Sequence, residues 1–186
     1  MDRKQEIVKA AAKTFALYGY KATSVDQIAR AAGVGKGTIY TFFVNKEELF
    51  QAIVLSTIEE MKVEANRVLV PAATPAENAH HALMKMLEFR ETHQLLARLI
   101  EEERATQSKA VMEMMQQVEK AIVEFIEERL TRALPRLKVE PRLLAYLLYK
   151  SYVAFVVEWP DLYEQPLDEK TISEFFHQSL FKGLLP

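Results

Sequence analysis

Residues 23–50, TSVDQIARAAGVGKGTIYTFFVNKEELF, contain the pattern that decides the fold. Ser24 and Gln27 have the spacing of a capping box, which predicts the start of a short helix. Gly33 ends that helix, a second short helix follows, and Asn45 has the position of a cap for a third, longer one. Two short helices around a glycine-marked turn form a helix-turn-helix, which places one helix in the major groove of DNA.

The composition favours an all-α protein. Of the 186 residues, 49% are hydrophobic and 27% charged, a balance typical of a globular chain with a buried core. Helix-forming residues dominate, and no run alternates apolar and polar residues as a half-buried strand does. The absence of cysteine excludes disulfide scaffolds, thiolate metal sites and cysteine nucleophiles. No apolar run approaches the ~18 residues of a membrane span, so we expect a cytoplasmic protein with no membrane partner.

The net charge of −2 is unevenly distributed along the chain. Residues 1–50 hold eight basic and five acidic side chains, 8 − 5 = +3, so the remainder carries −2 − 3 = −5. We call residues 1–50 the head and the remaining residues the body. A mildly basic head and an acidic body are expected when only the head contacts the phosphates of a nucleic acid.

Apolar residues at helical spacing predict nine helices. The expected ranges are 3–18, 25–32, a helix opening near Gly35 or Lys36, a long helix from Asn45 to Pro71, then 75–93, 95–104, 108–134, 142–159 and 169–184. Trp159 and Pro160 are expected to stop the eighth helix, and Asp168 to cap the last one. All seven prolines lie at or after position 71, so none interrupts the first three helices.

The start of the predicted recognition helix is small and basic, which lets the backbone approach DNA closely. Lys36 is expected to reach guanine acceptors or phosphate, and Tyr40 and Thr41 lie one turn further on the same face. Hydroxyls and charge at the starts of the neighbouring helices are expected to bind phosphate. The predicted DNA-binding residues are Thr23, Ser24, Gly35, Lys36, Gly37, Thr38, Tyr40, Thr41 and Lys46.

Over roughly residues 5–50 the chain resembles the TetR family of transcriptional regulators. The matching residues are Phe15, Gly19, Tyr20, Thr23, Ile28, Ala29, Ala32, Gly33, Val34, Lys36, Gly37, Thr38, Ile39, Tyr40, Phe43, Lys46, Glu47, Glu48 and Leu49. The resemblance implies a helix-turn-helix DNA-binding domain over 1–47 and a helical effector-binding and dimerisation domain over 48–186. Phe42 stands where the family often has Tyr or His, and Gly35 where Ser or Ala is common, so we expect fewer side-chain contacts with DNA at both positions.

The resemblance also implies a small-molecule pocket among the fifth to eighth helices. Methionines cluster in this part of the chain, and their adaptable side chains suit either a core or a site for varied apolar ligands. The predicted ligand-binding residues are Met84, Leu87, Met112, Met115, Val118, Tyr149 and Phe155. The expected effector is a small hydrophobic molecule, aliphatic or aromatic.

The last two helices are too apolar for a single chain of this size to bury. Pairing each with its copy across a two-fold axis buries the excess in a four-helix bundle, which predicts a homodimer. The predicted interface residues are Tyr146, Tyr149, Val153, Phe176, Leu180 and Phe181.

Two E-x-x-H motifs raise the alternative of a di-iron-like helical metalloenzyme. They are Glu77 with His80 and Glu174 with His177, and such a site needs two further carboxylates, for which Glu88 and Glu103 are candidates. Chance matches are common in an acid-rich helical chain, so we assign no metal, no cofactor and no catalytic residue. The histidines at 80, 81 and 93 could also meet a ligand, and the run 101–104, EEER, reads as a solvated helix end.

Other enzymatic sites are excluded by their spacing. The stretch 33–37, GVGKG, has neither the four-residue gap nor the Ser/Thr of a phosphate-binding loop, and no G-x-S-x-G is present. The leading hypothesis is therefore a homodimeric, ligand-responsive repressor that binds a palindromic operator in double-stranded DNA. The metalloenzyme and a DNA-binding protein with no effector remain the alternatives.

Overall fold

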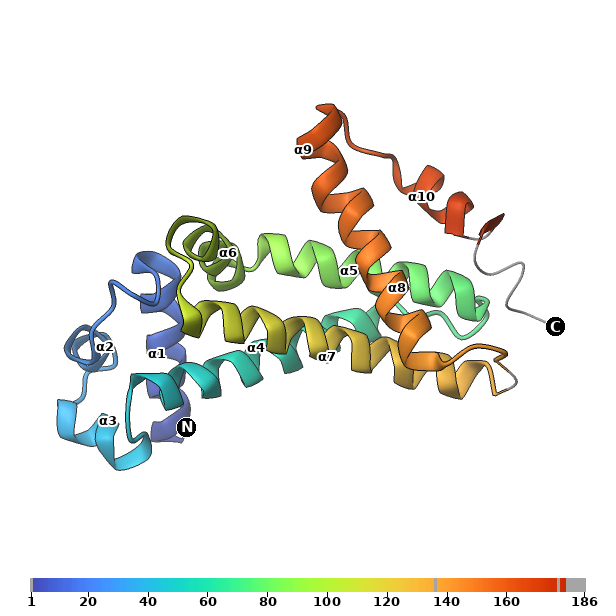
Figure 1. Cartoon of the computed structure of the whole chain (residues 1–186). Coiled ribbons are helices and arrows are strands. Elements are labelled where there is room, and N and C mark those ends of the chain that lie inside the picture. The colour runs from blue at the N-terminus through green and yellow to red at the C-terminus, as the bar shows by residue number, and fades with distance from the viewer. Residues whose placement is uncertain (1, 136, 177, 180–186) are drawn as a thin grey trace. The chain divides into compact units, whose positions relative to one another are not determined.

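The computed structural model describes residues 2–135, 137–176 and 178–179, except for the side chains of 75, 76, 90 and 91. Its elements over these residues are all helical (Figure 1). They are α1 (Arg3–Tyr18), α2 (Val25–Ala31), α3 (Lys36–Phe42), α4 (Lys46–Arg67), α5 (Pro75–Thr92), α6 (Gln94–Thr106), α7 (Lys109–Ala133), α8 (Pro141–Val153), the π-helix η1 (Ala154–Glu158), α9 (Trp159–Tyr163) and α10 (Glu169–Phe176). The all-α prediction is confirmed. No helix in the described part of the chain is long and apolar enough to cross a membrane.

The chain divides into two compact units. Unit 1 comprises residues 1–60 and 90–118, and unit 2 comprises 61–89 and 119–186. Unit 1 thus joins α1, α2 and α3 to the first part of α4, to α6 and to the start of α7. These units group residues by packing and not by role, so the functional boundary predicted at residue 47 stays a prediction.

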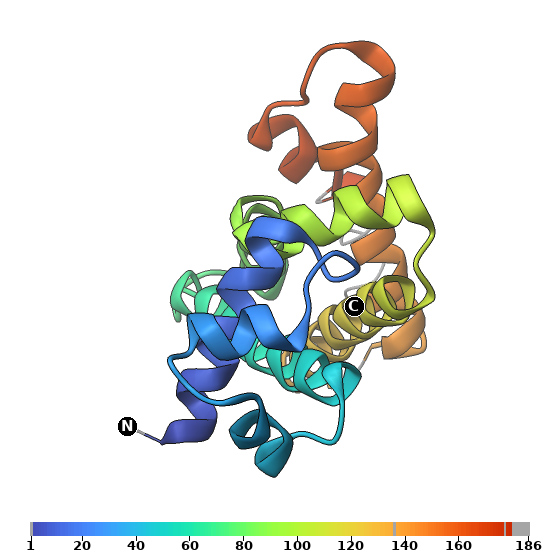
Figure 2. The same cartoon turned by 90° about the vertical axis from the view of Figure 1, so that its left-hand side faces the viewer.

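Unit 1 is built around the apolar faces of its first helices. Ile7, Ala11 and Phe15 of α1 are fully buried, as are Ile28 of α2 and, nearly so, Ile39 of α3. Helix α2 packs against both α1 and α3, and α6 packs against α1 (Figure 2). The helix spacing read from the sequence therefore produces a three-helix head, because each short helix has one buried stripe.

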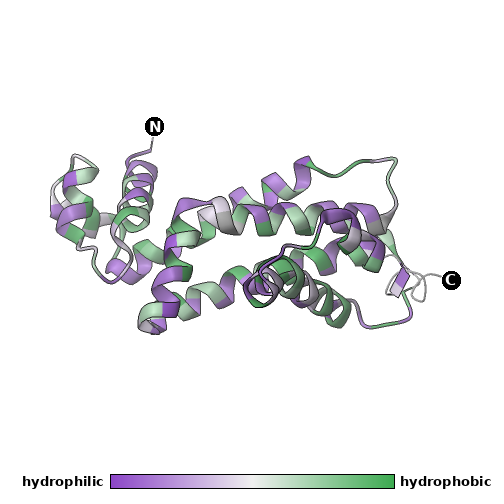
Figure 3. Cartoon of the chain, turned by 90° about the horizontal axis from the view of Figure 1, so that it is seen from above, coloured by the Kyte–Doolittle hydropathy of each residue, from purple (hydrophilic) through white to green (hydrophobic). Residues whose placement is uncertain are grey.

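Unit 2 is formed by parts of α4, α5 and α7 together with α8 and the helices after it. Its core includes Leu83 and Met86 of α5, Leu148 and Tyr152 of α8, and Phe176 of α10. The rings of Tyr152 and Phe176 stack with centroids 4.3 Å apart. Figure 3 shows that the helices carry hydrophilic and hydrophobic residues along their length, as amphipathic helices do.

The prediction that Trp159 and Pro160 stop the eighth helix is wrong. Helical backbone continues from α8 through η1 into α9, which ends at Tyr163. Proline has no N–H to donate and obstructs the carbonyl four residues before it. The wider π-helical turn accommodates this, since the Trp159 N–H bonds to the oxygen of Ala154, five residues back.

The long helix α4 ends at Arg67, four residues before Pro71, so the prediction that it continues to this proline is wrong. The other described helix ends lie within two residues of the predicted ones. Asp168 accepts a bond from the Thr171 N–H at 2.9 Å, so it caps α10 as expected. Residue 177 and residues 180–184 of the predicted last helix lie outside the described residues.

Candidate functional site

Helix α3 presents a polar face on the head. Lys36, Tyr40 and Thr41 are exposed, whereas Ile39 on the opposite face is buried. Gly35 is the N-cap with no side-chain hydrogen bond, and Gly37 has open space around its Cα. The backbone at the start of α3 is therefore accessible, as close approach to a DNA groove requires.

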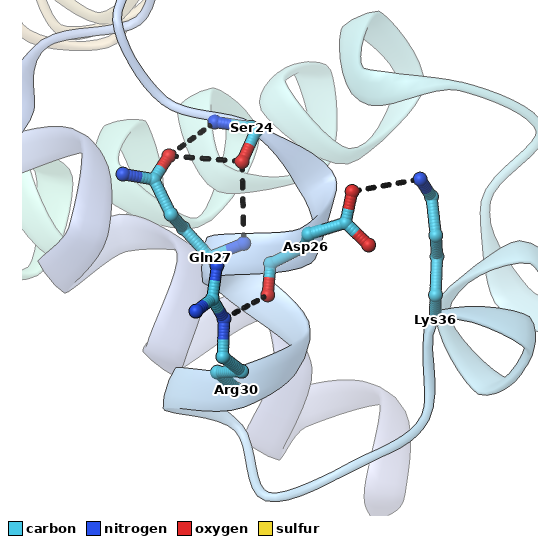
Figure 4. A network of polar contacts seen from close by, with 5 residues as sticks. All are labelled: Ser24, Asp26, Gln27, Arg30 and Lys36. Carbon is cyan, nitrogen blue, oxygen red and sulfur yellow. Dashed lines mark hydrogen bonds and ion pairs between the residues drawn. The ribbon is translucent and has the colours of Figure 1, made fainter.

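Lys36 is held by a neighbouring acid. Its Nζ lies 2.8 Å from Oδ2 of Asp26 in α2, and both side chains are about half exposed (Figure 4). The hydrogen bond to Asp26, and then the carboxylate charge, raise the pKa of Lys36. An exposed ion pair contributes little stability, so Lys36 can exchange its carboxylate partner for a phosphate.

Ser24 caps α2 as the sequence predicted. Its Oγ accepts from the Gln27 N–H at 3.3 Å, and Oε1 of Gln27 accepts from the Ser24 N–H at 2.7 Å (Figure 4). The Ser24 hydroxyl also donates to Oε1 of Gln27 at 2.9 Å. The capping box thus fixes the start of α2 beside the exposed side chain of Arg30.

Thr23 and Lys46 do not have the placement expected of phosphate ligands. The Thr23 side chain is 2% exposed, and its hydroxyl donates to the Gly19 oxygen at 2.7 Å. The Lys46 Nζ donates to the oxygens of Tyr20 at 3.0 Å and Thr23 at 3.1 Å, and lies 4.3 Å from the Tyr20 ring centroid. Both residues hold the loop between α1 and α2, because the Thr23 hydroxyl and two of the three N–H donors of the Lys46 ammonium are already used inside unit 1.

A buried carboxylate holds the same loop, and sequence reasoning missed it. Glu102 of α6 is 8% exposed, and its two oxygens accept from the backbone N–H groups of Tyr20 at 2.6 Å and Lys21 at 2.8 Å. The prediction of a solvated helix end at 101–104 is therefore wrong for Glu102. Its neighbour Glu101 fits that prediction, since it is exposed and pairs with Arg98 at 3.0 Å.

Gly19 makes room for this carboxylate. It has φ +82° and ψ 166°, a conformation that only glycine adopts readily. A Cβ added there would lie 2.5 Å from Oε2 of Glu102. The α1–α2 loop is therefore fixed by Gly19 and by two charged side chains, Glu102 and Lys46, which bond to its N–H and carbonyl groups.

Unit 2 contains a cavity of about 360 Å³. It is lined by Leu69, Ala73, Asn78, Ala79, Ala82, Phe125, Ile126, Arg129, Leu130, Arg132 and Ala133, which come from α5, α7 and the segment after α4. This volume lies within the usual range of small-molecule sites. The wall is mainly apolar, with the two arginines as its cationic groups.

The seven predicted ligand-binding residues lie outside this cavity. Leu87, Val118 and Tyr149 are buried in helix packing, and Met112 is 39% exposed. Met84, Met115 and Phe155 are partly buried. Apolar residues at helical spacing mark a buried face, and that pattern does not separate a core from a cavity wall.

The predicted dimer residues fall into different environments. Tyr146 is 46% exposed, whereas Tyr149 and Phe176 are buried in their own chain and offer a partner almost no surface. Val153 is partly buried. Leu180 and Phe181 lie outside the described residues.

The histidine motifs have local partners. Glu77 accepts from the N–H and hydroxyl of Thr74, so it serves the cap of α5. His80 is buried, with Nδ1 hydrogen-bonded to the Tyr152 hydroxyl and Nε2 3.3 Å from Oε1 of Glu169. His177 of the second motif lies outside the described residues. Among the residues that are described, no three His, Asp or Glu side chains are grouped to hold a metal.

Comparison with known proteins gives a consistent result. Residues 7–53 match the family of bacterial regulatory proteins described as tetR. Over 187 aligned residues, 99% of this chain and 97% of the relative, the chain is 40% identical to YhgD of Bacillus subtilis (strain 168), described as an uncharacterized HTH-type transcriptional regulator.

Two solved structures share the fold over nearly the whole chain. One is the transcriptional regulator FadR from Bacillus subtilis in complex with stearoyl-CoA, with 21% identity, a TM-score of 0.67, and coverage of 97% of this chain and 98% of that one. The other is AibR in complex with isovaleryl coenzyme A and operator DNA, with 22% identity, a TM-score of 0.57 and the same coverage. At this identity the likeness shows the fold alone.

Proposed function

Because this chain belongs to the tetR family of bacterial regulatory proteins and is an HTH-type transcriptional regulator, we propose that it is a homodimeric cytoplasmic repressor released from a palindromic operator by a small apolar effector. The observation that supports DNA recognition is the exposed polar face of α3, whose opposite face is anchored in the core by the buried Ile39. Lys36, Tyr40 and Thr41 are the side chains that reach base edges and phosphates, with Thr38 and the backbone at Gly35 and Gly37 beside them. Arg30 is exposed on α2, where it can contact phosphate, and Ser24 is exposed at the cap, although its hydroxyl already donates to Gln27.

The homodimer is supported by exposed apolar side chains in unit 2. Leu143, Tyr146 and Leu147 are 64%, 46% and 47% exposed, and their spacing puts them on one face of α8. Phe175 of α10 is 48% exposed. An apolar helix face of this kind favours an isologous contact with a second copy. This set replaces the buried Tyr149 and Phe176 of the sequence prediction.

The apolar cavity of unit 2 supports the effector. Two proteins of the same fold carry acyl thioesters of coenzyme A in their solved complexes. An effector shifts DNA binding only by as much as it prefers one state of the protein, typically about 1–3 kcal/mol.

Selection from a random pool of DNA duplexes tests the proposal. We expect enrichment of an inverted repeat whose half-sites lie one helical turn, about 34–36 Å, apart. Sedimentation should give twice the chain mass of 21.4 kDa, and Leu147→Glu should give the monomer mass. Recovery of no sequence motif at moderate salt would contradict DNA recognition. If the protein binds a selected duplex and no apolar small molecule releases it, the result would instead support the alternative of a DNA-binding protein without an effector.

A further inference from the structure

Arg129 differs from the other described arginines of unit 2 in its partners. Arg67 pairs with Glu64, Arg132 with Glu128, and Arg142 with Glu127. Arg129 has no carboxylate within ion-pair distance among the residues that the structure describes. Its Nη2 donates to Oδ1 of Asn66, an uncharged acceptor.

The Arg129 guanidinium also keeps a buried donor without an acceptor. Its Nε is buried, and no atom of the described residues accepts a hydrogen bond from it. A guanidinium has five N–H donors in a fixed plane that matches the two oxygens of a carboxylate or phosphate. A buried donor is costly to leave unpaired, so this position favours a bound anion.

Two contacts orient the Arg129 guanidinium, one with Asn66 and one with the Phe125 ring. The guanidinium Cζ lies 4.9 Å from the centroid of the Phe125 ring, which also lines the cavity. Asn78 ties the segment after α4 to α5, with its side chain bonded to the Val70 N–H at 2.8 Å and the Val70 oxygen at 2.9 Å. The cavity therefore has a positioned cation on walls that are otherwise mainly apolar.

We propose that this cavity binds an anionic amphiphile, with the apolar chain against the α5 and α7 side chains and the acidic group on Arg129. The inference rests on the proposed effector site and names the chemistry of its ligand. The acidic group is either the carboxylate of a free fatty acid or a phosphate of its coenzyme A ester, and both match the guanidinium.

Titration calorimetry with three probes of one chain length tests this assignment: decanoate, decanoyl-CoA and decanol. At least one anionic probe should bind the wild type about tenfold more tightly than decanol, the gain expected for a charge-assisted hydrogen-bonded pair. Whichever anion shows the preference identifies the source of the acidic group. Equal affinity for all three probes, or binding of none, would overturn the proposal.

Arg129→Gln should reduce the anion preference to about twofold or less while decanol binding is kept. Arg132→Gln is the matched control, because Arg132 lines the same cavity but already has Glu128 as a partner. An unchanged preference in Arg129→Gln would sink the assignment. If that variant does not fold, Arg129→Lys decides, since it keeps the charge but loses the planar pair of donors and should lose most of the preference.

Affinity for the selected duplex, measured with the same probes, separates this inference from the proposed function. An anion that binds through Arg129 and leaves DNA affinity unchanged supports the site and contradicts effector release. Release by decanol as effective as release by both anions supports an effector but contradicts the role of Arg129.

Discussion

Each unit holds a charged side chain with buried polar atoms, and the two side chains have opposite hydrogen-bond environments. Glu102 in unit 1 has both oxygens occupied by backbone N–H groups of one loop. Arg129 in unit 2 has an uncharged acceptor on one nitrogen and none on its buried Nε among the described residues. A buried carboxylate whose two oxygens both accept hydrogen bonds holds the protein's own backbone, whereas a guanidinium with a buried unpaired donor favours an anionic ligand.

The largest effect on folding should come from Glu102→Leu. It leaves the N–H groups of Tyr20 and Lys21 without an acceptor, so the free energy of unfolding should fall by about 3 kcal/mol. Urea denaturation measures this. Glu101→Gln is the control, because Glu101 is exposed on the same helix, and its midpoint should be nearly unchanged. Equal midpoints for the two variants would mean that Glu102 does not hold the loop.

Gly19→Ala should destabilise by about 2 kcal/mol, because alanine is strained at φ +82° and its Cβ meets Glu102. Gly37→Ala provides the contrast, since Gly37 lies inside α3 with open space around it. That variant should gain up to about 1 kcal/mol, as alanine is the better helix former. Thermal unfolding of both without DNA makes the comparison, and equal behaviour would refute the role of Gly19.

The variants Lys46→Gln and Lys36→Gln should have different effects, because Lys46 stabilises the α1–α2 loop and Lys36 is proposed to contact DNA. Lys46→Gln loses two bonds to carbonyl groups and should destabilise by about 1.5 kcal/mol. Lys36→Gln should leave the urea midpoint unchanged, weaken DNA binding, and reduce the slope of log affinity against log salt by about 2, because each protomer of the proposed dimer loses one phosphate contact. If Lys46→Gln instead reduced the salt dependence of DNA affinity, the phosphate contact predicted for Lys46 from the sequence would be supported.

The smallest effect should be a loss of stability in acid that depends on His80. Burial lowers the pKa of His80, an effect that the bond to Glu169 opposes and the neighbouring His81 reinforces. The unfolded chain therefore binds more protons from about pH 6.5 downward, so the stability present above that pH is lost as pH falls through the folded-state pKa. Urea midpoints between about pH 7.5 and about pH 5.5 measure the loss.

His80→Gln should flatten part of that pH dependence. The remainder belongs to His93, whose pKa is also lowered by burial. Tyr152→Phe is the matched control, because it removes the hydroxyl partner of His80 and keeps the titrating ring. A pH dependence identical to the wild type in His80→Gln would show that this histidine does not titrate with folding.

The head was predictable to the extent that its interactions are local. The Ser24–Gln27 capping box and the Gly35–Thr38 opening involve residues three apart, and both took the expected positions. The roles of Thr23 and Lys46 were not predictable, because a hydroxyl and an ammonium suit phosphate and backbone carbonyls equally well. Only the fold decides which acceptor is closer.

The sequence by itself determined the all-α class, the helix-turn-helix and the exposed residues that α3 presents, since helix spacing, caps and glycine turns act over a few residues. Tertiary structure alone decided that Glu102 bonds to loop groups 82 and 81 residues away and that Arg129 faces a cavity without a carboxylate partner in the described chain. The physical reason is that the sequence gives the charge of a side chain, whereas the distant helices that pack around it determine its burial and its hydrogen-bond partners.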